Sequence, residues 1–102
     1  MARFLNAGAI RARVVDITTA GTAVQLSSTS YPIPDGVAVV VKAAPANTGN
    51  IFVGGSQSDA QTAANRYTLV PNESVSLQVQ DLNMVWVDAA TSGDDVQYLL
   101  EV

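Results

Sequence analysis

Residues 74–80 read SVSLQVQ, a strict alternation of polar and apolar side chains. A period of two places Val75, Leu77 and Val79 on one side of an extended strand and the serines and glutamines on the other. Such a strand is half-buried, with one face against a core and the other in solvent. This stretch therefore predicts an antiparallel β-sheet that is packed on one side.

Seven further segments carry β patterns and are separated by turn residues. Their approximate bounds are 10–17, 22–26, 37–43, 50–54, 66–70, 83–89 and 96–102. About eight short strands in a chain of 102 residues predict one all-β domain. We expect a single antiparallel β-sandwich or a jelly-roll-like barrel at residues 10–102, preceded by an N-terminal arm at residues 1–9.

Individual segments give finer expectations. The valine-rich residues 37–43 predict a strand buried on both faces at the centre of a sheet. Residues 31–36 contain two prolines and end in Asp-Gly, which indicates a connection rather than a central strand. Good helix formers at residues 59–64 predict a short helical turn, for which Ser58 would be the N-cap.

The composition indicates a neutral polar surface. Hydrophobic residues make up 48% of the chain and charged residues only 14%, with Lys42 as the single lysine. Monomeric β domains usually protect the edges of their sheets with charged side chains. We therefore expect neighbouring subunits to cover the edges, by oligomerisation or by strand addition. The alternative is that prolines and loops of the same chain protect them.

The charges are unevenly distributed along the chain, which has a net charge of −4. Three arginines precede the first acid, Asp16, so a basic N-terminal part is followed by an acidic body. The candidate partner-binding residues are Arg3, Phe4, Leu5, Arg11 and Arg13. They would extend onto a partner or exchange into a neighbouring subunit; the alternative is a frayed terminus followed by an ordinary first strand. A broad basic face with interleaved aromatics is lacking, so nucleic acid is not an expected partner.

Catalytic and metal-binding residue types are scarce. The chain has no cysteine and no histidine, which excludes Ser-His-Asp and Cys-His catalysis, imidazole zinc sites and thiolate sites. The remaining candidates are carboxylates at predicted turns: Glu73, Asp81, Asp88, Asp94 and Asp95. We interpret them as caps and turn residues. A calcium site at Asp94 and Asp95, joined by Asp88, is the alternative, but their spacing fits no calcium-loop motif. We predict no enzyme activity and no cofactor.

The aromatic residues and the hydropathy add two expectations. Trp86 and Tyr98 lie among apolar residues and are expected in the core, whereas Tyr31 and Tyr67 lie near loops and are expected to be exposed. No apolar run approaches the length of a membrane span, and the first residues lack the apolar core of a secretory signal. We expect synthesis in the cytoplasm and no membrane partner.

Four stretches of the chain carry a resemblance to a known class of proteins. They are VVVKA at 39–43, NTGNIFVG at 47–54, LVPNESV at 69–75, and VWV at 85–87 followed by GDDV at 93–96. Residues 37–102 resemble small virion proteins of tailed bacteriophages, of the head decoration or cement kind. Those proteins often have Pro-Gly where this chain has Pro71-Asn72, and Asn tolerates the same turn. The N-terminal arm matches no pattern of that class.

The resemblance implies a β-sandwich or jelly-roll subunit on the outside of a phage capsid. Such subunits commonly form trimers, bind the major capsid protein and clamp adjacent coat subunits. A head-to-tail or tail component is an alternative within the same class. A carbohydrate-binding β-sandwich is an alternative from a different class, with Tyr31, Tyr67 or Trp86 as the stacking platform.

Overall fold

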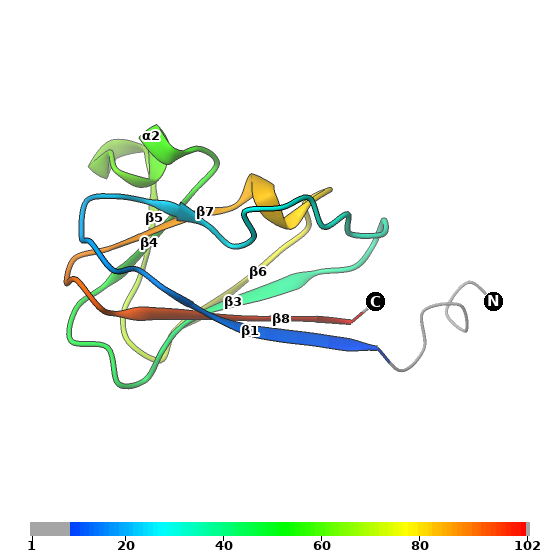
Figure 1. Cartoon of the computed structure of the whole chain (residues 1–102), viewed down its shortest axis with the longest axis horizontal. Helices are drawn as coiled ribbons and strands as arrows, with labels where there is room; N and C mark the ends of the chain where they lie inside the picture. The colour runs from blue at the N-terminus through cyan, green and yellow to red at the C-terminus, as the bar shows by residue number, and fades with distance from the viewer. Residues whose placement is uncertain (1–8, 102) are drawn as a thin grey trace.

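The computed structural model describes residues 9–101, which fold as two packed antiparallel sheets of four strands each (Figure 1). The strands are β1 (Ile10–Asp16), β2 (Val24–Gln25), β3 (Val39–Ala43), β4 (Ile51–Gly54), β5 (Tyr67–Leu69), β6 (Ser74–Leu77), β7 (Trp86–Ala89) and β8 (Asp95–Glu101). The β1 sheet has the order β1-β8-β3-β6 and the β2 sheet has the order β2-β7-β4-β5. The predicted all-β sandwich is confirmed, and these sheets do not close into a barrel.

The strand order follows from folding the chain as one long hairpin. β4 pairs with β5, β3 with β6, β2 with β7 and β1 with β8, all antiparallel. Two further antiparallel pairs, β3 with β8 and β4 with β7, join these four strand pairs into the two sheets. Eight strands wrapped in this way form a double-sheet jelly roll.

The core lies between the sheets and is built from alternate residues of each strand. Val96, Tyr98 and Leu100 of β8 are at most 3% exposed, so the predicted apolar face of this segment is confirmed. Its last predicted member, Val102, lies outside the described residues. The alternation predicted at residues 74–80 is also confirmed, although β6 ends at Leu77 and its apolar side is half-buried.

β3 differs from its prediction in one respect. It lies inside its sheet, between β8 and β6, as expected. Only Val39, Val41 and Ala43 are fully buried, however, while Val40 and Lys42 on the other side of the strand are half-buried. The prediction of burial on both faces is wrong, because no described element covers the outer face of the β1 sheet.

The outer face of the β2 sheet is covered by a short helical segment, α2 (Gln57–Ala60), followed by the 3-10 turn η1 (Ala63–Asn65) (Figure 1). Gly54 of β4 allows this contact, since a Cβ atom on it would lie 2.6 Å from the backbone nitrogen of Ala60. The N-cap of α2 is Ser56 rather than the predicted Ser58. The Ser56 hydroxyl accepts a hydrogen bond of 3.1 Å from the backbone nitrogen of Asp59.

A second 3-10 turn, η2 (Leu82–Met84), precedes β7 and shifts the start of that strand from the predicted Asn83 to Trp86. Val87 and Ala89 of β7 point into the core, so Trp86 lies on the opposite side of the strand and is half-buried. The prediction of Trp86 as a core residue is therefore wrong. The run of apolar neighbours concealed the alternation that places this side chain on the outer face.

Candidate interaction surface

The outer face of the β1 sheet exposes large apolar side chains. We define the apolar patch as Ile10, Ala12, Val14, Val40 and Leu99. Ile10 is 68% exposed, Val14 62% and Leu99 45%. Exposed apolar residues are common singly, but a contiguous group of them on a monomer marks an interaction site.

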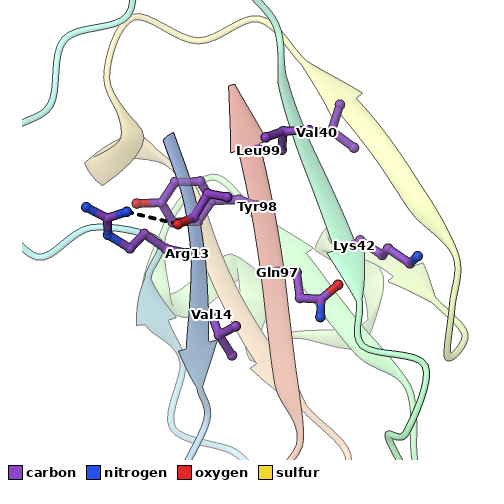
Figure 2. A pocket seen from close by; sticks show the side chains of 8 residues that line it. Arg13, Val14, Val40, Lys42, Gln97, Tyr98 and Leu99 are labelled. Carbon is purple, nitrogen blue, oxygen red and sulfur yellow. Dashed lines mark hydrogen bonds between the residues drawn. The ribbon is translucent and has the colours of Figure 1, made fainter. Parts of the chain in front are cut away.

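The strand register makes this patch contiguous. One row across the sheet holds Ala12, Leu99 and Val40 in directly opposed positions. The adjacent row holds Val14, Gln97 and Lys42, which Figure 2 shows on β1, β8 and β3. These two rows line an open groove of ≈ 510 Å³ on the sheet. The centre of the face is apolar and its polar groups lie around it.

Charged side chains occupy the rim of the same face. Asp16 is paired with Asp95 at one end of β1 and β8, and Ile10 is paired with Glu101 at the other end. Burial raises the pKa of Asp95, and the neighbouring carboxylates of Asp16 and then Asp94 raise it further. Lys42 is the only cation among the outward residues of β3. The rim therefore holds both an acidic end and a nearby positive charge.

The arginines of β1 point to the core side of the sheet. The Nε of Arg11 donates a hydrogen bond of 3.0 Å to the hydroxyl of Tyr98, and its guanidinium lies 4.3 Å from the centroid of the Tyr31 ring. Both tyrosines thus contribute to holding Arg11 within the fold. Arg13 is exposed, and its Nη1 donates to the carbonyl of Ala12 at 2.9 Å (Figure 2).

Of the candidate partner-binding residues, the structure describes only Arg11 and Arg13. Arg3, Phe4 and Leu5 lie outside the described residues. Arg11 and Arg13 lie on the same side of β1, but Arg11 is engaged within the fold and Arg13 is the one that remains accessible. Sequence reasoning missed the apolar patch, because the alternation along residues 10–15 separates two faces without showing which one meets the core.

The sheet edges are less open than the composition suggests. β2, β5 and β6 contain two, three and four residues, and short edge strands offer little backbone for pairing. β1 is a longer edge of seven residues, and Arg11 and Arg13 on it are charges of the kind that discourage edge pairing. Within residues 9–101, the uncovered face is thus a stronger candidate for association than the edges.

Asp94 lies in the turn before β8 and caps a loop, as predicted, whereas Asp88 was predicted at a turn but lies within β7. Asp94 is 6% exposed and accepts hydrogen bonds from the backbone nitrogens of Thr48 at 3.1 Å and Gly49 at 2.9 Å. Asp88 is 2% exposed and accepts from the backbone nitrogen of Gly21 at 2.9 Å. These carboxylates tie distant loops together.

Asp81 fixes the connection before β3 in the same way. It accepts hydrogen bonds from the Ser30 hydroxyl and from the backbone nitrogens of Tyr31 and Asn83. These bonds, the one from Ser30 most strongly, lower the pKa of Asp81. Among residues 9–101, no group of three acids is placed to hold a metal ion, so the geometry does not favour the calcium alternative.

The three aromatic residues considered for sugar binding lie on different parts of the fold. Tyr31 lies beneath the Arg11 guanidinium, and Trp86 lies on the outer face of the β2 sheet. Tyr67 is 60% exposed and lines a groove of ≈ 560 Å³ together with Asn65 and Arg66. They do not form one stacking platform, although Tyr67 alone has the exposure expected of one.

No protein-family model, curated protein or solved structure matches this chain. Over the part of the chain that the structure describes, no helix has the length and apolar character needed to cross a membrane.

Proposed function

We propose that the chain is a non-enzymatic structural subunit of a bacteriophage particle, bound to the outside of the head, where it stabilises contacts between coat subunits. The observation that supports this proposal is the apolar patch, which leaves the middle of a four-stranded sheet without a covering layer in residues 9–101. The sequence resemblance to decoration proteins supplies the virion setting, and jelly rolls are frequent among capsid proteins. The fold alone does not determine function.

A decoration protein needs buried area rather than chemistry. Each copy that binds the assembled shell stabilises it by mass action, so many weak contacts repeated by symmetry hold the shell closed. A chain without histidine or cysteine, and with few charges, suits this role. Arg13, together with the arm residues Arg3, Phe4 and Leu5, is proposed to contact acidic and apolar groups of the coat protein.

Immunogold labelling of phage particles from the organism that carries the gene tests the location. We expect antibodies against the chain to label the whole surface of the head in electron micrographs. Label restricted to one vertex would instead support the head-to-tail alternative. Particles that carry no label, although the chain is expressed, would contradict a virion role.

Cosedimentation with capsids purified without the chain tests the proposed contact residues. Deleting residues 2–9, or replacing Arg13 by Glu, is expected to reduce the amount of chain that sediments with the capsids. Thermal melting by circular dichroism provides the control, because a loss of cosedimentation at an unchanged melting temperature assigns the effect to the contact rather than to unfolding. Unchanged cosedimentation of both variants would rule out the arm as the capsid contact.

The exposure of Tyr67 supports carbohydrate binding as the second candidate function. Glycan-array binding that Tyr67→Ala abolishes would support it, since stacking on a sugar ring requires the aromatic face. Absence of glycan binding would remove this alternative.

A further inference from the structure

We infer that residues 1–7 pair with β1 of the same chain as an additional antiparallel strand, joined to it by a two-residue turn at Gly8-Ala9. β1 lies at the edge of its sheet, with β8 on one side and no described strand on the other (Figure 1). The arm would occupy that open side and become the outer strand of the β1 sheet. This pairing concerns the isolated chain and does not depend on the virion role.

The backbone of β1 has hydrogen-bonding groups that face the open edge. Next to β1, the nitrogen of Ile17 donates to the carbonyl of Asp94 at 3.0 Å, and the carbonyl of Ile17 accepts from Gly93 at 2.8 Å, so Ile17 faces the β8 side. Along an antiparallel strand these groups alternate in direction, and the register of β1 with β8 is continuous. The groups that face the open edge therefore belong to Ile10, Ala12, Val14 and Asp16. Consistently, the Ala12 carbonyl accepts a bond of 2.9 Å from the Arg13 side chain.

The sequence just before β1 suits a tight reversal of the chain. Two-residue hairpin loops of type II′ have glycine at their first central position, and Gly8-Ala9 supplies it. Ala9 is exposed, as expected at the tip of a loop. Such a loop makes Ala7 and Ile10 a hydrogen-bonded pair. Because Ile10 is one of the residues whose backbone groups face the open edge, the loop length and the free groups of β1 agree.

The outward side chains of the paired arm complement those of β1. Residues 1–7 suffice to pair along the whole of β1, and Leu5 then lies opposite Ala12, where it extends the apolar patch. Arg3 lies diagonally across from Asp16 on the same face. Asp16 is directly opposite Asp95 of β8, and like charges in such a pair repel each other, so a cation beside them is stabilising.

The side chains on the other face of the arm also find a partner. In the same register Phe4 lies opposite Arg13, which is exposed and donates to the neighbouring carbonyl of Ala12. The backbone of the paired arm takes over that carbonyl, so the Arg13 guanidinium can lie on the Phe4 ring. Arg11 makes the same kind of contact within the fold, 4.3 Å from the centroid of the Tyr31 ring. The arginine that discourages pairing with a foreign strand thus becomes a contact for the arm.

Amide hydrogen exchange of the full chain, measured by nuclear magnetic resonance, tests the pairing residue by residue. The amides of Ala12 and Val14 are expected to exchange about tenfold more slowly in the full chain than after deletion of residues 2–7. The amides of Arg11 and Arg13 face β8 and are the internal controls, which should change less than about threefold. Equal exchange of the Ala12 and Val14 amides in the two chains would show that the edge stays open and would overturn the inference.

The turn is tested at Gly8. Gly8→Ala is expected to speed exchange of the Ala12 and Val14 amides about fivefold, because the first central position of a type II′ turn has a positive φ that alanine rarely adopts. Ala9→Ser is the matched control, since the second central position has an ordinary negative φ, and it should change these rates less than about twofold. If the two variants behave alike, the proposed turn is wrong.

An introduced disulfide distinguishes pairing within one chain from exchange of the arm between two copies. The chain has no cysteine, so two introduced cysteines have no other thiol to compete with them. Phe4 and Arg13 would form a non-hydrogen-bonded pair with Cα atoms about 4.5 Å apart, which a disulfide spans. Phe4→Cys with Arg13→Cys is expected to oxidise to a cross-linked monomer at low concentration. Phe4→Cys with Ala12→Cys is the matched control, because Ala12 points to the opposite face, and it should stay reduced.

Two outcomes of the oxidation would contradict pairing within the chain. Cross-linked dimers at every concentration would mean that the arm pairs with β1 of another copy. Equal oxidation of the two cysteine pairs would mean that the arm has no fixed register on β1. Neither experiment uses a capsid, so failure of the pairing leaves the proposed function to its own labelling test, and absence of label on phage particles leaves the pairing intact.

Discussion

The two sheets have four strands each, but within residues 9–101 only the outer face of the β2 sheet is covered by another element. In the β2 sheet, α2 packs against β4 and β7, and Asp88 is 2% exposed although it points away from the core. In the β1 sheet, Val14 and Leu99 point outward and remain largely exposed. Within residues 9–101, the chain supplies a covering layer to the β2 sheet and none to the β1 sheet. An uncovered face next to a covered one is therefore informative about assembly.

The contrast is tested most strongly by two neighbouring leucines of β8. Leu100 is 2% exposed and Leu99 is 45% exposed. Leu100→Ala should lower the unfolding free energy by about 3 kcal/mol, because it leaves a cavity in the core. Leu99→Ala should cost less than about 1 kcal/mol under dilute, monomeric conditions. Urea denaturation measures both, and equal costs would mean that the outer face is already covered.

The packing of α2 on the β2 sheet can be disrupted by substituting Gly54. Gly54→Ala should cost about 2 kcal/mol, because the new methyl group would collide with the Ala60 backbone. Gly55→Ala is the matched control, since nothing lies within 4 Å of a Cβ atom there, and it should change stability by less than about 0.5 kcal/mol. Thermal or chemical denaturation distinguishes the two variants. If they behave alike, α2 does not pack as described.

A smaller effect is expected at the carboxylate on the covered face. Asp88→Ala should lower the unfolding free energy by about 1 to 2 kcal/mol, because the backbone nitrogen of Gly21 loses its acceptor. Asp35→Ala, at an exposed turn position, should have little effect. Hydrogen exchange provides a second measurement, since the Gly21 amide should exchange faster in the first variant only.

The smallest effect concerns pH and the carboxylates of the uncovered face. Burial, and then Asp16, raises the pKa of Asp95 above its ordinary value of 3.8, so the folded chain binds this proton more tightly than the unfolded chain. The unfolding free energy therefore falls as pH rises from 3.8 through the raised pKa. At pH 7, Asp95→Asn should be more stable than wild type by less than about 1 kcal/mol, and this difference should vanish at lower pH.

Asp81 provides the control of opposite sign in the same pH titration of stability. Its pKa is lowered, first by the hydrogen bond from Ser30, so its contribution is present above pH 3.8 and is lost as pH falls through the lowered pKa. Asp81→Asn should therefore be less stable than wild type at pH 7. If both variants shift stability in the same direction, the opposite environments assigned to these two carboxylates are wrong.

The sequence predicted the strands and several turns because their signals are local. Asn72 has φ 76°, as the Pro71-Asn72 turn required, and Val96, Tyr98 and Leu100 share the buried face that their spacing indicates. The pairing of strands could not be predicted, because β1 meets β8 only through the tertiary fold. The sequence pattern of one strand does not show which distant strand it pairs with.

The candidate surface was harder to predict than the fold. Ile10 and Val14 alternate with Arg11 and Arg13, and ordinary hydrophobicity would place the valine inside and the arginines outside. The structure reverses this, because the Arg11 side chain bonds Tyr98 and stacks on Tyr31. The packing of α2 on the outer face of the β2 sheet was not predicted either. It depends on the absence of a side chain at Gly54, which the sequence pattern does not relate to α2.

Because β8 lies between β1 and β3, the outer face of the β1 sheet can form only after β8 has been synthesised. The contact between Arg11 and Tyr98 joins positions 87 residues apart, so β1 has no described strand beside it until β8 has been synthesised. Closing so long a loop is a late and slow step in folding. A nascent chain on the ribosome therefore lacks the finished outer face, which forms only once β8 lies between β1 and β3.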